Sequence, residues 1–452
     1  MADTLVDDRP LSFEDLLDWF QRGEKPKDAW RVGAEHEKFV FQLGTHEPVP
    51  YDGPAGIEAL LNGMMRFGWK GTYEGPHVIG LERGKANVSL EPGGQFELSG
   101  APLETMHDIC QETGVHLNEV KAVADELGLG FLGLGFTPNW RRDQIPVMPK
   151  GRYKIMREYM PKVGGLGLDM MFRTCTVQAN LDFGSEADMI AKFRVSLALQ
   201  PIGTALFANS PFVEGKPSGF LTKRANIWTD TDPNRTGMLD FVFKDGFGYE
   251  TYANYLLDVP MYFAKRNDQY VDLSGKSFRQ FMAGTLAEMP GDRASIKDFA
   301  DHSTTAFPEV RLKQYLEMRG SDSGPWSRLC ALPALWTGIF YDSAALAAAW
   351  DLCKDWPLED HERLRADVST LGMRAKIGGR TVREVAVDMV AIAKAGLKAR
   401  NRLSGAMIDE TGYLAELEEI ADSGMTPADR LLALYHGRWG GDVTPAFEEF
   451  AY

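Results

Sequence analysis

Alternation of polar and apolar residues is clearest between Cys175 and Phe183, where every second side chain is polar. Such alternation predicts a β-strand with one face on a core and the other face lining something polar. The same pattern recurs from Arg31 to Phe41, from Glu91 to Ser99 and from Glu309 to Arg319. One such segment alone is typical of an edge strand with a solvated polar face, whereas the recurrence indicates a shared polar surface.

The polar faces of these predicted strands are rich in carboxylates. Their members are Glu35 and Glu37; Gln95 and Glu97, with Glu91 nearby; Gln178, Asn180 and Asp182; and Glu317 with Arg319. Placed side by side in an antiparallel sheet, the strands would form a basin in which the carboxylates repel one another unless cations neutralise them. Mg²⁺ suits such a basin, because it takes oxygen ligands and bridges to substrate phosphates. The chain has no Cys/His ligand cluster of the kind that favours zinc, so the pattern indicates Mg²⁺-dependent phosphoryl transfer without a Walker loop.

A basic, glycine-bearing stretch runs from Pro149 to Gly167 and contains Arg152, Lys154, Arg157 and Lys162. Consecutive backbone amides and basic side chains can cradle a phosphate. A solvated loop is an equally good interpretation of the same residues.

Gly128, Gly130 and Gly133 match the spacing of a dinucleotide-binding fingerprint. That motif needs a strand before it and a helix after it. Here a predicted helix precedes the glycines and an apolar, strand-like run follows them, so a Rossmann fold is not indicated.

The remaining pattern indicates helices. Apolar residues recur at helical spacing from Leu103 to Leu127, and Gly128 predicts the end of that helix. The C-terminal third has the same spacing, with a capping box at Thr381 and Glu384. We therefore expect an α+β fold, with a catalytic sheet domain over residues 1–328 and a mainly helical region packed on it over residues 329–452.

Composition narrows the class of protein. The 452 residues include 64 acidic and 49 basic side chains, and the net charge of −15 argues against nucleic acid or an anionic membrane as partner. Four cysteines in so long a chain do not form a disulfide framework. The apolar run from Leu329 to Trp350 contains Pro333 and Asp342, which favours a buried helix over a membrane span. The acidic N-terminus lacks a signal-peptide core, and we expect a cytoplasmic protein.

Several stretches, in this order, resemble one family, the plant and proteobacterial type of glutamate–cysteine ligase. The most specific are residues 33–39 (GAEHEKF), 91–97 (EPGGQFE), 151–156 (GRYKIM), 171–178 (MFRTCTVQ), 227–232 (IWTDTD) and 315–320 (YLEMRG). The resemblance covers nearly the whole chain. It implies a fold like that of glutamine synthetase, in which a curved antiparallel β-sheet wrapped by helices carries the active site on its concave face.

The resemblance also implies a reaction. ATP, with Mg²⁺, phosphorylates the γ-carboxylate of glutamate, and the amino group of cysteine attacks the acyl phosphate in the first step of glutathione biosynthesis. The expected partners are therefore the small-molecule substrates glutamate, cysteine and ATP. We expect the protein to be a monomer or homodimer. Two alternatives stay open: a γ-glutamyl ligase that serves another thiol or amine pathway, and a non-catalytic sensor on the same fold.

By position, the resemblance assigns roles to individual residues. The expected metal ligands are Glu35, Glu37, Glu91, Glu97 and Glu317, and the expected catalytic residues are Glu317, Arg319 and Glu37. Substrate contacts are expected from Arg224, Arg311, Gln178, Asn180, Trp228 and Arg235, and contacts to ATP or its phosphates from Arg152, Lys154, Arg157 and Lys38. Gln178 stands where other ligases of the superfamily place a metal-binding histidine, which leaves open which residue fills that ligand position. The plastid-targeting extension of plant members is not recognisable, which again predicts a cytoplasmic location.

Overall fold

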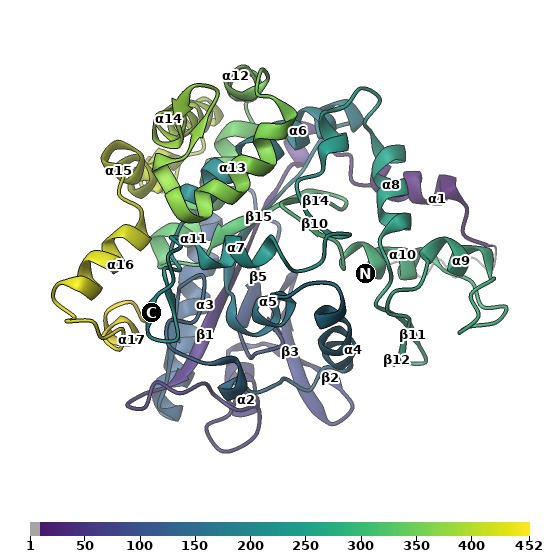
Figure 1. The fold of residues 1–452 in the computed structure, drawn as a ribbon, viewed down its shortest axis with the longest axis horizontal. Coiled ribbons are helices and arrows are strands. Elements are labelled where there is room, and N and C mark those ends of the chain that lie inside the picture. The colour runs from purple at the N-terminus through teal and green to yellow at the C-terminus, as the bar shows by residue number, and fades with distance from the viewer. Residues whose placement is uncertain (1–9) are drawn as a thin grey trace.

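A computed structural model of the protein describes residues 10–452 (Figure 1). Its centre is a nine-stranded sheet in the order β14-β15-β7-β1-β5-β4-β3-β2, and β6 also pairs with β1. Neighbouring strands in this sheet are antiparallel. The strands are β1 (Val32–Gln42), β2 (Lys70–Glu74), β3 (His77–Arg83), β4 (Ala86–Leu90), β5 (Phe96–Ser99), β6 (Leu129–Leu132), β7 (Thr176–Leu181), β14 (Val310–Leu312) and β15 (Leu316–Asp322). The predicted α+β class and antiparallel sheet are confirmed.

Three long helices cover one face of this sheet: α3 (Met106–Leu127), α6 (Glu186–Leu206) and α11 (Trp326–Phe340). The predicted end of α3 is confirmed, because Gly128 has a φ of 69° in the left-handed region that a residue with a Cβ adopts at a cost. Helix α6 continues through Pro201.

The other helices lie around this core. They are α1 (Phe13–Gln21), α2 (Ile57–Met64), α4 (Gly151–Tyr159), α5 (Gly167–Arg173), α7 (Lys223–Trp228), α8 (Tyr249–Asp258), α9 (Phe278–Ala283), α10 (Ile296–Ser303), α12 (Ser343–Cys353), α13 (Leu358–Leu371), α14 (Val382–Arg400), α15 (Ala415–Ser423), α16 (Pro427–His436) and α17 (Ala446–Glu449). Four two-stranded pairs complete the fold: β8 (Phe212–Val213) with β9 (Lys216–Pro217), β10 (Thr236–Gly237) with β13 (Phe307–Pro308), β11 (Phe263–Arg266) with β12 (Gln269–Asp272), and β16 (Lys376–Ile377) with β17 (Arg380–Thr381).

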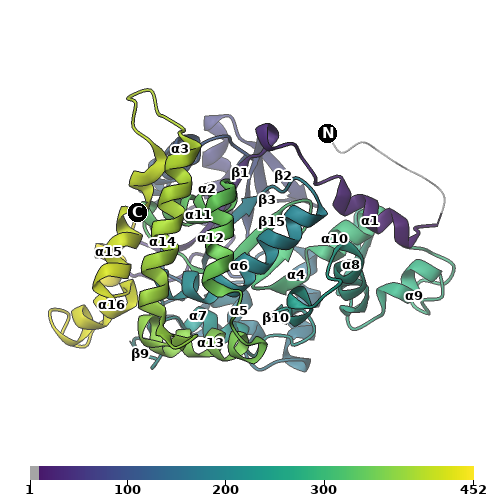
Figure 2. The same ribbon diagram turned by 90° about the horizontal axis from the view of Figure 1, so that it is seen from above.

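The C-terminal helices share their core with the sheet. One buried apolar cluster runs from Leu16 to Ala421 and joins residues of β7 and β15 to residues of α11 and α14. Figure 2 shows α12 and α14 side by side on this helical side of the molecule. The domain boundary expected at residue 328 falls inside α11, and the division into two domains stays a prediction.

Two expected segments differ from the structure. The stretch from Glu309 to Arg319 is a hairpin of β14 and β15, with Arg311 opposite Glu317. Alternation alone does not separate one strand from a tight hairpin, because the polar side chains of both arms share one face. The stretch from Pro149 to Gly167 holds helix α4 and a short turn of 3₁₀ helix, so the solvated-loop interpretation was wrong, and the phosphate-binding interpretation stays a prediction.

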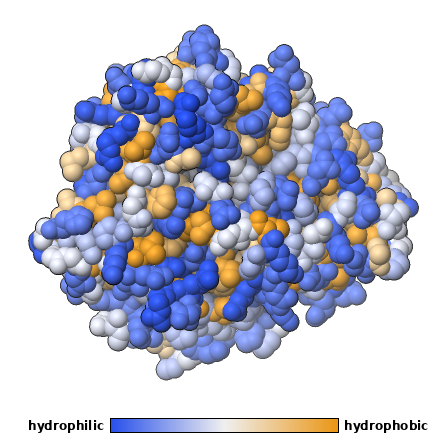
Figure 3. Space-filling view, viewed as in Figure 1, coloured by the Kyte–Doolittle hydropathy of each residue, from blue (hydrophilic) through white to orange (hydrophobic). Residues whose placement is uncertain are grey.

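The surface in Figure 3 is mostly hydrophilic, with apolar residues scattered in small groups. All four cysteines are free and buried. Among residues 10–452 no single helix is long and apolar enough to cross a membrane, although α11 and α12, which meet at a 94° bend, pass that test as a pair.

Candidate active site

A cavity of about 660 Å³ lies over the polar face of the sheet. Its walls come from β1, β5, β7, β15, helix α4 and the residues around Phe307. The expected site residues that line it are Glu35, Glu37, Glu91, Glu97, Arg152, Gln178, Asn180, Arg311, Glu317 and Arg319. Residues scattered over the first 319 positions thus meet in one place.

Strand register brings these side chains together. Glu37 of β1 lies opposite Glu97 of β5, and Glu35 lies opposite Gln178 of β7. On the other side of β7, Asn180 lies opposite Glu317 of β15. Because directly opposed side chains in an antiparallel pair lie about 5 Å apart, the sheet aligns polar groups from four strands in one surface.

We call Glu35, Glu37, Glu91 and Glu97 the carboxylate floor. Within residues 10–452, none of these carboxylates forms an ion pair with a basic side chain. Their hydrogen bonds come from neutral donors: Asn180 Nδ2 to Glu35 Oε1 (2.7 Å), the Thr176 backbone amide to Glu37 Oε2 (2.9 Å) and Ser89 Oγ to Glu97 Oε2 (2.7 Å). The negative charge of the floor is therefore not neutralised from within.

The pKa values of the floor reflect this crowding. Burial, together with the charges of Glu317 and Glu97, raises the pKa of Glu35 to about 7. Burial and the neighbouring carboxylates also raise the pKa of Glu37 well above its ordinary value and raise the pKa of Glu97. Buried carboxylates that repel one another favour a proton or a bound cation.

The floor fits a hard divalent cation by the chemistry of its donors, which are carboxylate oxygens. In the part of the chain that the structure describes, however, no three His, Cys, Asp or Glu side chains already stand in an arrangement that would hold a metal ion. The structure therefore places suitable ligands around one cavity without a closed coordination sphere.

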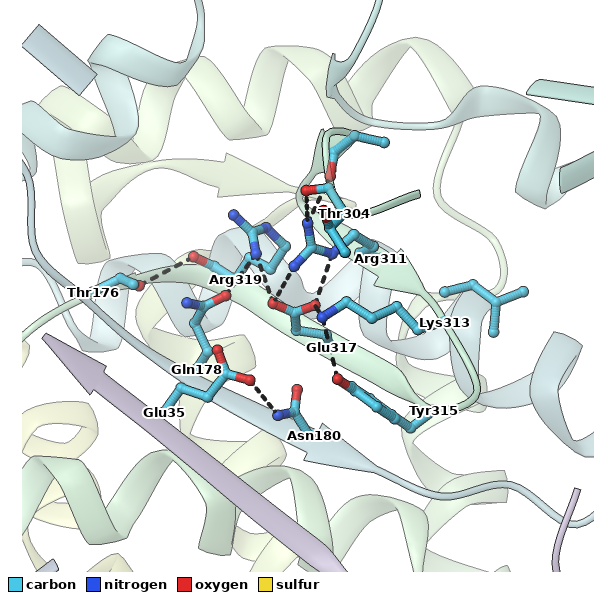
Figure 4. A network of polar contacts seen from close by, with 12 residues as sticks. Glu35, Thr176, Gln178, Asn180, Thr304, Arg311, Lys313, Tyr315, Glu317 and Arg319 are labelled. Atoms are coloured by element: carbon cyan, nitrogen blue, oxygen red, sulfur yellow. Dashed lines mark hydrogen bonds and ion pairs between the residues drawn. The ribbon is translucent and has the colours of Figure 1, made fainter. Parts of the chain in front are cut away.

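Glu317 is in the opposite electrostatic situation (Figure 4). Arg311 donates to both of its oxygens, from Nε at 2.8 Å and Nη2 at 2.9 Å. Arg319 Nη1 lies 2.6 Å from Oε1, and Lys313 Nζ lies 3.3 Å from Oε2. We call these four residues the Glu317 cluster. Burial opposes ionisation of Glu317, but the charges of Arg311, Lys313 and Arg319 outweigh it and hold its pKa well below the ordinary value.

The expected role of Glu317 as a metal ligand does not match this geometry, because both of its carboxylate oxygens are engaged by basic side chains. The amide oxygen of Gln178 is engaged too, by Arg319 Nη1 at 2.7 Å. Gln178, which the resemblance placed at a ligand position, therefore spends a hydrogen bond of its amide oxygen on Arg319.

Several expected site residues do not line the cavity. Arg224 is buried beneath it, where its Nη2 donates to the backbone oxygen of Arg319 at 3.0 Å and its Nη1 has no partner among residues 10–452. Trp228 packs against Phe307, which does line the cavity. These two residues support the wall and do not form its surface.

Three further side chains are fully buried elsewhere or lie outside. Arg235 is engaged by Asp232, Thr305 and the backbone oxygen of Pro260, so it has no donor for a substrate. Lys154 and Arg157 lie on the exposed side of α4, and only Arg152 reaches the cavity. Helical spacing explains this separation, since residues two and five positions apart face different directions.

Lys38 lies on the wrong face of β1 for a phosphate contact. Strand alternation points Glu37 toward the cavity and Lys38 away from it. Its Nζ is buried 3.0 Å from His36 Nδ1, and burial lowers its pKa to about 7. The same alternation that found the carboxylates could have excluded this lysine.

Sequence reasoning missed cavity residues of two kinds. Lys313 and Tyr315 sit between the two strands of the hairpin, and their place in the alternating run was the available signal. Arg22 and Lys25 come from a connection that carries no recognisable pattern, and Lys85 lies in the turn between β3 and β4.

Comparison with known proteins gives consistent findings. A family model described as glutamate-cysteine ligase family 2 (GCS2) matches residues 31–449. A chloroplastic glutamate–cysteine ligase of Nicotiana tabacum is 57% identical over 451 residues, covering 100% of this chain and 85% of that protein. The chloroplastic glutamate–cysteine ligase of Arabidopsis thaliana is 56% identical over the same length and covers 100% of this chain and 85% of that protein.

A solved structure has the same overall fold. The crystal structure of a glutamate–cysteine ligase from Francisella tularensis in complex with AMP aligns with a TM-score of 0.53 and 12% sequence identity, covering 93% of this chain and 89% of that chain. At this identity the likeness concerns the fold.

The expected cytoplasmic location is wrong by these comparisons, because the relatives are named as chloroplastic enzymes. Acidic first residues do not distinguish one compartment from another. They carry no information about import into an organelle.

Proposed function

We propose, from the premise that the chain belongs to glutamate–cysteine ligase family 2, that the cavity over the sheet is the active site of a Mg²⁺-dependent glutamate–cysteine ligase. The enzyme joins the γ-carboxylate of glutamate to the amino group of cysteine at the expense of ATP, the first step of glutathione biosynthesis. The observation that carries the site assignment is the carboxylate floor, whose members have no basic ion-pair partner among residues 10–452 and line a cavity of about 660 Å³.

The reaction needs activation of a carboxylate. Transfer of the γ-phosphoryl group of ATP to the γ-carboxylate of glutamate gives an acyl phosphate and ADP. The nitrogen of the cysteine amine then attacks the carbonyl carbon, the bond to the phosphate oxygen breaks, and the amine loses a proton. Both steps build negative charge on phosphoryl or carbonyl oxygens, which positioned cations stabilise.

The carboxylate floor supplies one part of this electrostatic environment. Glu35, Glu37, Glu91 and Glu97 would hold Mg²⁺, which when bound neutralises charge on the triphosphate. Asn180, Ser89 and the backbone amide of Thr176 orient three of these carboxylates by the hydrogen bonds described above.

The Glu317 cluster supplies the other part. Of its basic side chains, Arg311 and Arg319 both pair with the single carboxylate of Glu317 and so leave one positive charge in excess next to the floor. In this proposal Glu317 fixes Arg311 and Arg319 in place, and their remaining donors contact the transferred phosphoryl group or a substrate carboxylate. Arg311 is in turn anchored by the backbone oxygens of Thr304 and Ala306.

The remaining expected residues keep narrower roles. Arg152 approaches the floor from α4 and is the basic residue of that helix able to contact ATP phosphates. Arg224 donates to the backbone oxygen of Arg319 and is buried outside the cavity surface, so we assign it a supporting role in place of the expected substrate contact. We keep the prediction of a monomer or homodimer with small-molecule substrates.

The proposal is tested by ADP release from purified protein. We expect release only when Mg²⁺, ATP, glutamate and an amine acceptor are all present, with cysteine as the preferred acceptor. Turnover of ATP that is indifferent to glutamate would contradict the proposal and favour a nucleotide-binding protein of another function.

A further inference from the structure

Beside the Glu317 cluster, the turn of the β14–β15 hairpin presents two polar groups with unused hydrogen-bonding capacity (Figure 4). Lys313 Nζ lies 3.1 Å from the hydroxyl oxygen of Tyr315 and 3.3 Å from Glu317 Oε2. An ammonium group has three donors, so one N–H of Lys313 is left over. The O–H of Tyr315 has no acceptor among residues 10–452. Two donors, one of them charged, thus point to a carboxylate as their partner.

An unused acceptor lies on β7, the strand that pairs with β15. Asn180 donates from Nδ2 to Glu35, and its Oδ1 has no hydrogen-bond partner in the described chain. In Figure 4 this oxygen points to the side on which Tyr315 stands. Gly33 lies opposite Asn180 on β1, where a Cβ would approach the Asn180 side chain to 3.2 Å, so the glycine keeps space beside it.

An α-amino acid has a carboxylate that accepts hydrogen bonds and an amine that donates one. Two donors beside one acceptor therefore match it. We propose that Lys313, Tyr315 and Asn180 form the subsite for the acceptor amino acid: Lys313 and Tyr315 bind its α-carboxylate, and Asn180 Oδ1 accepts a hydrogen bond from its amine. This inference rests on the proposed function, and it adds the residues that select an amino acid over a simple amine.

The position of the subsite favours the acceptor over glutamate. The acceptor reacts only after the acyl phosphate has formed, so its site must stay open while glutamate and ATP are bound. Lys313 and Tyr315 lie at the rim, on a hairpin turn whose Gln314 donates to the backbone oxygen of Trp19 in α1. Arg311 and Arg319 lie further along the cavity, against the residues around Phe307.

Substitution of Lys313 separates the two half-reactions. We expect Lys313→Met to raise KM for cysteine roughly 10- to 100-fold, as for loss of one hydrogen bond to a charged group, while KM for glutamate and for ATP changes less than about threefold. Hydroxylamine has no carboxylate, so formation of γ-glutamyl hydroxamate from glutamate and ATP should be retained. Tyr315→Phe keeps the ring but loses the hydroxyl. We expect it to raise KM for cysteine by a smaller factor, again with little change in KM for glutamate and for ATP. Lys70→Met, on the exposed edge strand β2, is the matched control.

Cysteamine, which is cysteine without the carboxylate, gives the sharpest comparison. The preference of the wild-type enzyme for cysteine over cysteamine should narrow by roughly 10-fold or more in Lys313→Met. The subsite is overturned if this preference is unchanged, or if the variant loses hydroxamate formation and glutamate affinity as much as it loses cysteine affinity. If the wild-type protein forms neither hydroxamate nor ADP in response to glutamate, the proposed function itself fails, which is a different result. Circular dichroism of both variants verifies that they are folded.

Discussion

The carboxylate floor and the Glu317 cluster both contain glutamates at one sheet, yet the electrostatic surroundings of these glutamates are opposite. Glu35, Glu37 and Glu97 have neutral hydrogen-bond donors and raised pKa values, because they are buried among like charges. Glu317, in contrast, is buried among three basic side chains that hold its pKa low. The comparison teaches that a glutamate on the polar face is not by itself a metal ligand. The carboxylates of the floor have no basic ion-pair partner among residues 10–452, whereas both oxygens of Glu317 are already paired.

The largest expected effect is on stability at the cluster. Glu317→Gln removes the buried carboxylate and leaves three cations facing one another, so we expect the free energy of unfolding to fall by about 3–5 kcal/mol. Urea denaturation measures this change. Glu126→Gln is the matched control, because it removes the exposed partner of Arg66 and should change stability by less than about 1 kcal/mol. Equal effects of the two substitutions would remove the distinction between the cluster and an ordinary surface pair.

The next effect is on catalysis at the floor. Glu37→Gln keeps the size and the acceptor oxygen of the side chain but loses its charge. We expect kcat to fall roughly 10²- to 10³-fold, the range found when an electrostatic contact to the transition state is lost. Steady-state ADP release gives kcat, with Glu82→Gln on the exposed side of β3 as control. A near-normal kcat for Glu37→Gln would place the reaction elsewhere.

A third effect concerns pH. The pKa of Glu35 is raised from 4.5 to about 7, so the folded state holds this proton more tightly than the unfolded state does. Its contribution to stability is therefore full below about pH 4.5 and is lost as pH rises to about 7, a difference of roughly 3 kcal/mol. We expect Glu35→Gln to gain stability relative to the wild-type protein by about this amount across that range when chelator is present.

Comparing the variant with the wild-type protein at each pH is necessary. The buried histidines act in the opposite direction, because burial lowers the pKa values of His36, His116 and His302. Their contributions cancel in the difference between the two proteins. A stability difference that does not vary with pH would contradict the raised pKa of Glu35.

The smallest expected effect is at α4. Lys154 and Arg157 are exposed and do not line the cavity, so we expect their joint replacement by alanine to change kcat and KM for ATP less than about twofold. Arg152→Ala, on the cavity side of the same helix, should raise KM for ATP several-fold more. Equal effects of the two replacements would extend the phosphate site over the outer side of α4.

The sequence predicted the strands of the sheet better than it predicted the hydrogen-bond and ion-pair partners of their side chains. Alternation located β1 and β7, because burial of one face imposes a period of two. It also placed Glu35 and Glu37 together. It did not reveal that Arg311 lies across from Glu317, since that contact depends on a hairpin turn.

The sequence likewise did not show which residues would pair with a given basic side chain in the folded chain. Arg235 was expected to bind a substrate, but Asp232, Thr305 and Pro260 occupy its donors in the folded chain. A basic residue in a recognisable motif is therefore a weak guide to its role until its partners are known. Residues on connections, such as Arg22 and Lys25, gave no pattern from which the cavity could have been predicted.

The central claim is that the floor, and not Glu317, binds the divalent cation. Electron paramagnetic resonance of Mn²⁺ added with a non-hydrolysable ATP analogue tests it directly, in wild-type protein, Glu97→Gln and Glu317→Gln, each verified as folded by circular dichroism. We expect Glu97→Gln to weaken Mn²⁺ binding at least roughly 10-fold and Glu317→Gln to change it less than about threefold. Loss of Mn²⁺ binding in Glu317→Gln with normal binding in Glu97→Gln would contradict the account.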